Sequence, residues 1–196
     1  YLRRGDMPAV LATFERVMAD HKIRQFGETL GDAEIAAFIE EVKNAPEYFT
    51  EWQVIGPFDN VERAGFDTAY PPEQEVALDK EYAGKDGATL RWQQTTPGRT
   101  GYVDLLRFLQ PAEDSVAYAY REFAVDANET VELQLGSNDG VKLWLNGELL
   151  LENKASRTAR PGDERLSLPL RQGKNTVLLK IDQIGGGWGF YFGLMK

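Results

Sequence analysis

Residues 136–152 read GSNDGVKLWLNGELLLE, and this stretch decides the fold of the chain. Asn146 and Gly147 separate two runs that are rich in apolar residues, 141–145 and 148–151. Both Asn and Gly tolerate the positive φ angles of a two-residue type I′ turn. The stretch therefore predicts a tight antiparallel hairpin.

The first arm of this hairpin has the period of a β-strand. Val141, Leu143 and Leu145 alternate with Lys142 and Trp144. Alternation of this kind is typical of a strand with one face on a hydrophobic core. We therefore expect the sheet to be covered on one side only.

A second turn is predicted just before the hairpin, at Asn138, Asp139 and Gly140. The preceding run 131–135 also alternates apolar and polar residues, as strands do. A strand on each side of a short turn is typical of a meander, so we expect run 131–135 to lie beside the hairpin.

The composition is that of a globular protein, because the 196 residues are 42% hydrophobic and 27% charged. The chain has no Cys, which excludes disulfides, thiol catalysis and zinc sites built on thiolates. The net charge of -9 opposes binding to phosphate backbones. No run approaches the roughly 18 consecutive apolar residues that a spanning helix needs. We expect no nucleic-acid partner and no membrane span.

Two amphipathic helices are predicted before Pro46. Apolar residues recur on one helical face in 10–18 and again in 35–42. Together they form a helical hairpin within residues 1–47, which we interpret as the tail of an upstream region. The chain opens at Tyr1 without Met, so we expect it to be part of a longer protein.

The sequence pattern changes after residue 47, where short apolar and aromatic runs are separated by Gly, Pro, Asn and Asp. This pattern is typical of antiparallel sandwiches, and about ten strands suit a jelly roll. The predicted fold class is mainly β: an antiparallel jelly-roll β-sandwich over residues 48–196, preceded by the short N-terminal helical hairpin over residues 1–47. Passage 59–85 is too long for a simple connection, and we expect it to be functional, mobile or wrapped around a sheet edge.

Four stretches together resemble galactose-binding-like jelly rolls. They are WQVIGPF at 52–58, GFDTAYPPE at 65–73, SNDGVKLWLNG at 137–147 and GKNTVLLKI at 173–181. The last two are similar to the sugar-binding domain that precedes the barrel in β-galactosidase-type hydrolases. The Asn-Asp-Gly turn resembles the acidic turn of protective-antigen-type lectin domains. The resemblance covers residues 50–196.

Such jelly rolls are carbohydrate-binding-module-like accessory domains of exported bacterial proteins. The resemblance therefore implies a secreted or periplasmic location, a polysaccharide or oligosaccharide as partner, and neighbouring domains in the same polypeptide. It implies no cofactor. Calcium stays an open alternative. The lectins hold this ion with two successive acids, and this chain departs from that pattern because it has Asn138 and Asp139 there.

The candidate binding site lies at one end of the predicted sandwich and contains Trp188, Asn138, Asp139 and Arg157. Trp188 follows three glycines that leave it unshielded, so it is a candidate for stacking on a sugar ring. Asn138 and Asp139 have the groups that hydrogen-bond hydroxyls, and Arg157 suits an acidic sugar. Two structural alternatives stay open. In one, Trp188 is a buried core residue, and in the other, the Asn-Asp-Gly triplet serves only to form a turn.

No catalytic signature is present in the sequence. Pairs of neighbouring acids occur, but sequence spacing does not place two carboxylates the roughly 5 to 10 Å apart that glycoside hydrolysis needs. We expect a non-catalytic carbohydrate-binding or accessory module, not an enzyme. Two alternatives stay open, namely a purely structural or protein-docking β-sandwich and a polysaccharide-active enzyme domain such as a hydrolase or lyase.

Overall fold

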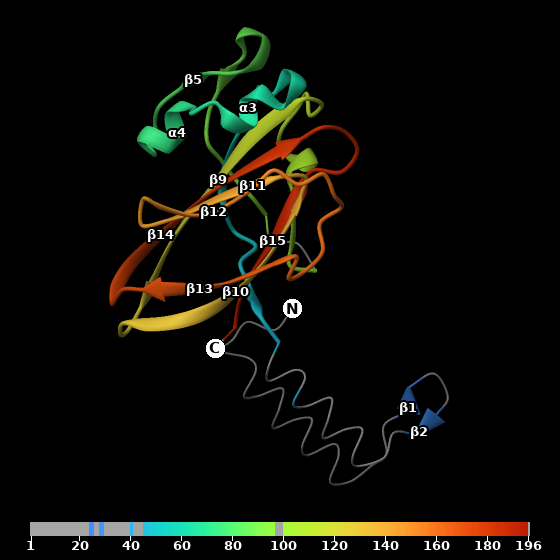
Figure 1. Cartoon of the computed structure of the whole chain (residues 1–196), viewed down its shortest axis with the longest axis vertical. Coiled ribbons are helices and arrows are strands. Elements are labelled where there is room, and N and C mark those ends of the chain that lie inside the picture. The colour runs from blue at the N-terminus through green and yellow to red at the C-terminus, as the bar shows by residue number, and fades with distance from the viewer. Residues whose placement is uncertain (1–23, 26–27, 30–39, 41–44, 97–99, 196) are drawn as a thin grey trace. The chain divides into compact units, whose positions relative to one another are not determined.

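The computed structural model describes residues 24–25, 28–29, 40, 45–96 and 100–195. The chain divides into two compact units, Tyr1–Glu47 with Met195–Lys196 and Tyr48–Leu194. The second unit is built mainly of antiparallel strands in two sheets (Figure 1). The predicted fold class, a mainly β antiparallel sandwich, is confirmed.

One layer of the sandwich is a five-stranded sheet. Its order is β13 (Glu164–Leu170), β10 (Glu129–Asn138), β15 (Gly189–Met195) and β3 (Glu47–Tyr48), and β8 (Tyr102–Asp104) also pairs with β15. A 3-10 turn, η3 (Leu105–Arg107), follows β8. β13 forms one edge of this sheet.

The other layer is a six-stranded sheet. Its order is β12 (Glu148–Asn153), β11 (Val141–Leu145), β14 (Gly173–Gln183), β9 (Ser115–Val125), β4 (Gln53–Asp59) and β7 (Gln93–Gln94). Every pairing in this sheet is antiparallel. β12 and β7 are its two edges.

The main core lies between the two sheets. Leu143 and Leu179 of the six-stranded sheet and Leu133 of the five-stranded sheet are fully buried in it. Trp52 packs edge-to-face on Phe190 at a centroid distance of 5.2 Å. The alternating residues of the strands thus supply one continuous apolar layer, which is the main stabilising element of a sandwich.

The hairpin predicted from residues 136–152 is confirmed. β11 and β12 pair through the turn at Asn146 and Gly147, whose φ angles are 51° and 83°. The predicted meander is wrong, because β10 lies in the five-stranded sheet and β11 in the six-stranded sheet. The turn 138–140 therefore carries the chain from one layer to the other.

Residues 60–92, named here the covering segment, lie over part of the outer face of the six-stranded sheet (Figure 1). The segment contains η1 (Val61–Arg63), α3 (Ala64–Asp67), α4 (Pro71–Gln74), β5 (Tyr82–Ala83), η2 (Lys85–Gly87) and β6 (Thr89–Leu90). Its Tyr70, Leu90 and Trp92 form a second hydrophobic cluster with Phe58 and Tyr118 of the sheet. The expectation that the sheet is covered on one side only is therefore wrong, because this cluster buries part of the second face.

Most of the predicted helical hairpin lies outside the described residues. Within that region the structure describes a short antiparallel pair, β1 (Arg24–Gln25) with β2 (Glu28–Thr29), and a helical residue, Glu40. Among the described residues, no helix has the length and apolarity to cross a membrane.

Candidate functional site

The turn 138–140 and the loops 153–163 and 184–188 meet at one end of the sandwich. The Asp139 carboxylate accepts hydrogen bonds from the backbone N–H groups of Arg157, at 2.9 Å, and Ile184, at 3.1 Å. Asn138 lies against the third loop, since a Cβ built on Gly187 would be 3.4 Å from its amide nitrogen. The structure thus brings Asn138, Asp139 and Arg157 together beside the loop that precedes Trp188.

Trp188 does not stand exposed at this end, and the expectation that it stacks on a sugar is corrected. Its side chain is fully buried in the main core, and its Nε1–H donates to the Ile181 carbonyl oxygen at 3.3 Å. Gly185, Gly186 and Gly187 are exposed above it. A large apolar ring gains more free energy by closing the end of the core than by facing water, so the glycines bend the chain while the ring points inward.

The other three predicted residues hold the loops together. The Arg157 guanidinium donates to the Ser137 hydroxyl at 3.0 Å and to the Glu164 carboxylate at 2.8 Å, and its side chain is 22% exposed. Asn138 and Asp139 are both buried. Asp139 and Arg157 thus use their polar groups within the protein. The Asn138 Oδ1 is buried and has no partner within the described residues. The same ion pair leaves Arg157 poorly placed to select an acidic sugar.

A different surface presents aromatic rings to solvent. One row of residues crosses the outer face of the six-stranded sheet, each paired with the next across the strands, and we name it the open row. Its members are Leu149, Trp144, Leu178, Tyr120, Gln53 and Gln94. Six strands at about 4.8 Å spacing make this row roughly 24 Å long. It is long enough to contact several units of a linear ligand.

Exposure and chemistry vary along the open row. Leu149 is 45% exposed at one edge, Trp144 and Tyr120 are half-buried, and Gln94 is exposed at the other edge. The Gln53 Nε2 donates to the side-chain Oε1 of Gln94 at 2.5 Å, so the two side-chain amides form one polar end. Rings in the middle and amides at one end are the groups by which proteins hold sugars.

Acid and hydroxyl groups border the open row on one side. The Tyr120 hydroxyl donates to the Glu122 carboxylate at 2.6 Å, and the Lys174 ammonium lies 2.6 Å from the same carboxylate. The hydrogen bond from Lys174, followed by that from Tyr120, lowers the pKa of Glu122. Burial, followed by the bond to Glu122, raises the pKa of Tyr120. Glu122 is therefore an ionised acceptor at neutral pH, and Tyr120 keeps its proton.

The covering segment forms the border on the Gln94 side. Trp92 packs on Tyr120 at a ring-centroid distance of 6.3 Å, and its buried Nε1–H has no partner within the described residues. A surface cavity of about 700 Å³ lies beside it, lined by Glu81, Thr89, Arg91, Trp92 and Gln93. This shallow cavity lies next to the Gln94 end of the open row in the chain, because Gln93 lines it.

A buried ion pair fastens the covering segment to the same face of the sheet. The Lys180 ammonium donates to the Glu73 carboxylate and to the Thr68 carbonyl oxygen, each at 2.7 Å. The Tyr118 hydroxyl donates to the same carboxylate oxygen of Glu73. The Lys180 side chain is fully buried, and this burial lowers its pKa although Glu73 opposes the shift. Burial and the bond to Glu73 raise the pKa of Tyr118.

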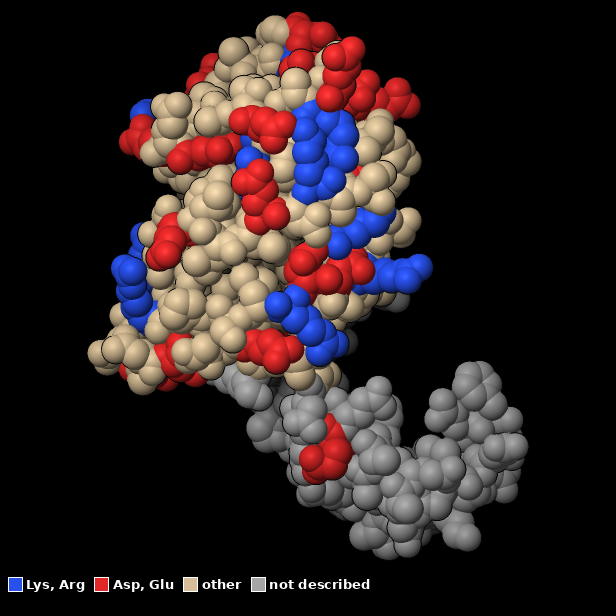
Figure 2. All heavy atoms as spheres, viewed as in Figure 1, with Lys and Arg blue, Asp and Glu red and all other residues tan. Residues whose placement is uncertain are grey.

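The two halves of this outer face differ in how their polar groups are used. In the covered half the charged groups are paired inside the protein, whereas in the open half rings, amides and a carboxylate border solvent. Among the described residues, no group of three or more His, Cys, Asp or Glu side chains is placed to hold a metal ion. Figure 2 shows Lys and Arg in small separate groups that are bordered by Asp and Glu on the face in view.

Sequence reasoning identified Trp144 as part of the polar face of the sheet but did not make it a site residue. The signal was present in its alternation with Leu143 and Leu145. What the sequence lacked was the cross-strand register that places Trp144 two strands from Tyr120. The register pairs residues that are far apart in the chain. The pattern of a single strand therefore does not show which residues of neighbouring strands lie beside it.

No model of a known protein family matches the chain, and no curated protein matches its sequence. Its fold is similar to part of a β-glucosidase from Kluyveromyces marxianus in complex with glucose, with 14% identity and a TM-score of 0.44 over 80% of this chain and 18% of that chain. The chain thus spans less than a fifth of that enzyme.

Two smaller domains are also similar in fold. One is the PA14 domain of the MpAFP antifreeze protein, with 15% identity and a TM-score of 0.41 over 76% of this chain and 85% of that chain. The other is a family 35 carbohydrate-binding module from an environmental isolate, with 14% identity and a TM-score of 0.33 over 48% of this chain and 73% of that chain. Similarities at this level do not assign a function.

Proposed function

We propose that the chain is a non-catalytic carbohydrate-binding module that holds a neutral glycan chain on the open row. The observation that carries this proposal is the row itself, in which Trp144 and Tyr120 stand two strands apart with the amides of Gln53 and Gln94 beyond them. Two strands correspond to roughly 10 Å. The two rings are therefore spaced to contact separate sugar units of one chain.

The chemistry of the row favours a neutral glycan. The apolar face of a pyranose packs on a Trp or Tyr ring, while its hydroxyls need acceptors and donors at the side. Glu122 supplies an ionised acceptor, and Gln53 and Gln94 supply amides. An acidic glycan would meet Glu122 and the net charge of -9 of the whole chain. We therefore infer that uronic-acid polymers bind less tightly than neutral ones.

The test compares soluble glycans on the whole chain. Affinity gel electrophoresis with galactomannan, mixed-linkage β-glucan and polygalacturonate ranks the ligands, and calorimetric titration then measures the tightest. Trp144→Ala is expected to weaken binding about tenfold or more, the scale of a central aromatic contact. Because Trp144 is half-buried at the surface, the variant is expected to fold.

Tyr191→Ala is the matched control. Tyr191 is also half-buried, but it belongs to the five-stranded sheet, where it packs on Tyr102 at a centroid distance of 5.0 Å. It should leave the affinity unchanged. Loss of binding in the Tyr191 variant with none in the Trp144 variant would move the site to the other sheet. Hydrolysis or cleavage of the bound glycan by the unmodified chain would overturn the non-catalytic assignment.

A further inference from the structure

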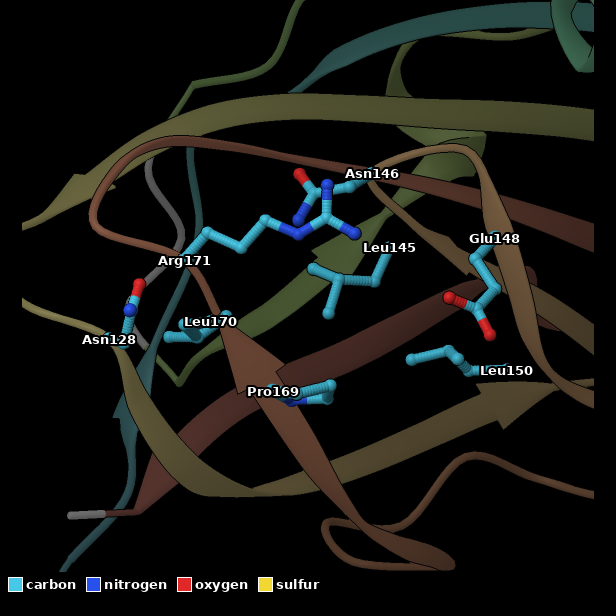
Figure 3. A pocket seen from close by; sticks show the side chains of 8 residues that line it. All are labelled: Asn128, Leu145, Asn146, Glu148, Leu150, Pro169, Leu170 and Arg171. Carbon is cyan, nitrogen blue, oxygen red and sulfur yellow. The ribbon is translucent and has the colours of Figure 1, made fainter.

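A second cavity lies at the opposite end of the sandwich from the turn 138–140. Its volume is about 240 Å³, and it opens between β12 and β13, the edge strands of the two sheets (Figure 3). Its floor is apolar and consists of Leu145, Leu150, Pro169 and Leu170. Pockets for drug-sized ligands measure about 300 to 1,000 Å³, so this one suits a smaller molecule.

The walls of this cavity are fixed by asparagine side chains. The buried Asn175 Oδ1 accepts hydrogen bonds from the backbone N–H of Arg171 and from the side-chain amide of Asn146, both at 3.0 Å. The Asn128 Oδ1 accepts one from the backbone N–H of Gln172 at 2.7 Å. The three turns that surround the opening are therefore tied to one another. A site that is already formed loses less conformational entropy when a ligand binds.

Two opposite charges face this cavity. Figure 3 shows the Arg171 side chain reaching over Leu145 toward Asn146, while Glu148 points into the same space from the other side. Within the described part of the chain, neither the Arg171 guanidinium nor the Glu148 carboxylate makes a hydrogen bond or ion pair. Both residues are solvent-exposed, so both charged groups are accessible to a ligand.

We propose that this cavity binds a free α-amino acid with an apolar side chain. The Arg171 guanidinium takes the carboxylate through two parallel hydrogen bonds, the Glu148 carboxylate takes the ammonium, and the leucine floor takes the side chain. A ligand with a single charge would pair with only one of the two side chains, Arg171 or Glu148, and would leave the other without a partner of opposite charge. None of the lining residues is aromatic, which separates this cavity from the sugar-binding open row.

The test is a titration of the ¹⁵N-labelled whole chain with L-leucine, followed by two-dimensional NMR. The backbone amide signals of Asn146, Glu148, Leu150 and Arg171 should shift and saturate. Isocaproate, which is leucine without its ammonium, and isoamylamine, which is leucine without its carboxylate, should each bind about tenfold or more weakly, since one charged hydrogen-bond pair is lost. Glycine, which lacks the apolar group, should also bind more weakly.

Variants separate the charge requirement from a general surface effect. Arg171→Gln and Glu148→Gln should each weaken leucine binding about tenfold or more. Arg165→Gln is the matched control, because Arg165 is an exposed arginine on β13 whose guanidinium pairs with Glu132 at 3.6 Å. It should bind leucine as the unmodified chain does. The proposal is overturned if leucine causes no saturable shift, if isocaproate or N-acetyl-leucine amide binds as tightly as leucine, or if the control loses affinity equally.

Discussion

Replacing Glu73 by Ala is expected to lower the free energy of unfolding by about 3 to 5 kcal/mol, because it leaves a buried ammonium without its anion. The Lys180 side chain is fully buried, and Glu73 is the carboxylate beside it, at 2.7 Å. The ammonium can escape this cost only by losing its proton. Taking a lysine from an unfolded pKa near 10.4 to neutrality at pH 7 costs about 5 kcal/mol, at about 1.36 kcal/mol per pKa unit. This second route sets the upper limit of the loss.

The loss should depend on pH in a defined direction. Burial lowers the folded-state pKa of Lys180 below its ordinary value of 10.5. Between these two values the unfolded chain binds more protons than the folded chain, so the free energy of unfolding rises with pH. Glu73→Ala removes the attraction that opposes this shift, so the folded-state pKa of Lys180 falls further. The pH range in which the free energy of unfolding rises then extends to lower pH. The deficit of the variant should therefore shrink as the pH approaches 10.5.

Urea unfolding followed by tryptophan fluorescence, at pH 7 and at about pH 10, measures both effects. Lys80→Met is the matched control within the covering segment. It breaks the pair of Lys80 with Glu75, which is as short, at 2.6 Å, but has side chains that are 56% and 70% exposed. An exposed pair of this kind is screened by water and contributes little to stability. A Glu73→Ala deficit no larger than that of the control, or one that does not change with pH, would refute the reasoning.

Three further predictions follow from burial and close packing. Trp188→Ala should lower the free energy of unfolding by about 3 to 5 kcal/mol in urea unfolding, and calorimetric titration of the folded variant should show unchanged glycan affinity. Gly136→Ala should cost about 1 to 3 kcal/mol in a thermal melt, because its Cβ would lie 2.0 Å from the Arg160 carbonyl oxygen. Burial raises the pKa of Tyr102 to about 12 from its ordinary 10.0. An ultraviolet titration should therefore show one tyrosine that ionises near pH 12, and this transition should be missing in Tyr102→Phe. Since the folded chain keeps this proton longer, the free energy of unfolding should fall as the pH rises from 10.0 toward about 12.

The local elements of the sandwich were predictable from the sequence because they depend on neighbouring residues. The turn at Asn146 and Gly147 follows from their tolerance of positive φ, and the inward direction of Val141, Leu143 and Leu145 follows from alternation. The partner of β10 was not predictable in this way. A short turn can join two strands of one sheet or two strands of different sheets. The crossing at residues 138–140 therefore depends on tertiary packing, which the local sequence pattern does not specify.

The site was harder to predict than the fold, and Trp188 shows why. Three glycines leave a Trp unshielded along the chain, but the direction of its ring depends on whether the core below has room for it. The core does have room, and burial of the ring is favoured. Lys142 shows the opposite case, in which alternation placed a polar residue correctly on the outer face. The sequence did not reveal that the covering segment buries it.

The covered and open halves of the outer face meet at Trp92 and Tyr120, so the proposed glycan site borders the covering segment. Trp92 belongs to the covering segment, whereas Tyr120 belongs to the open row, and their rings pack at 6.3 Å. Loosening of the segment removes the wall beside Tyr120 but leaves Trp144 in place on β11. Glu73→Ala should therefore weaken glycan binding less than Trp144→Ala does, when both are measured on folded protein. The reverse order would mean that the covering segment, and not the sheet, holds the glycan.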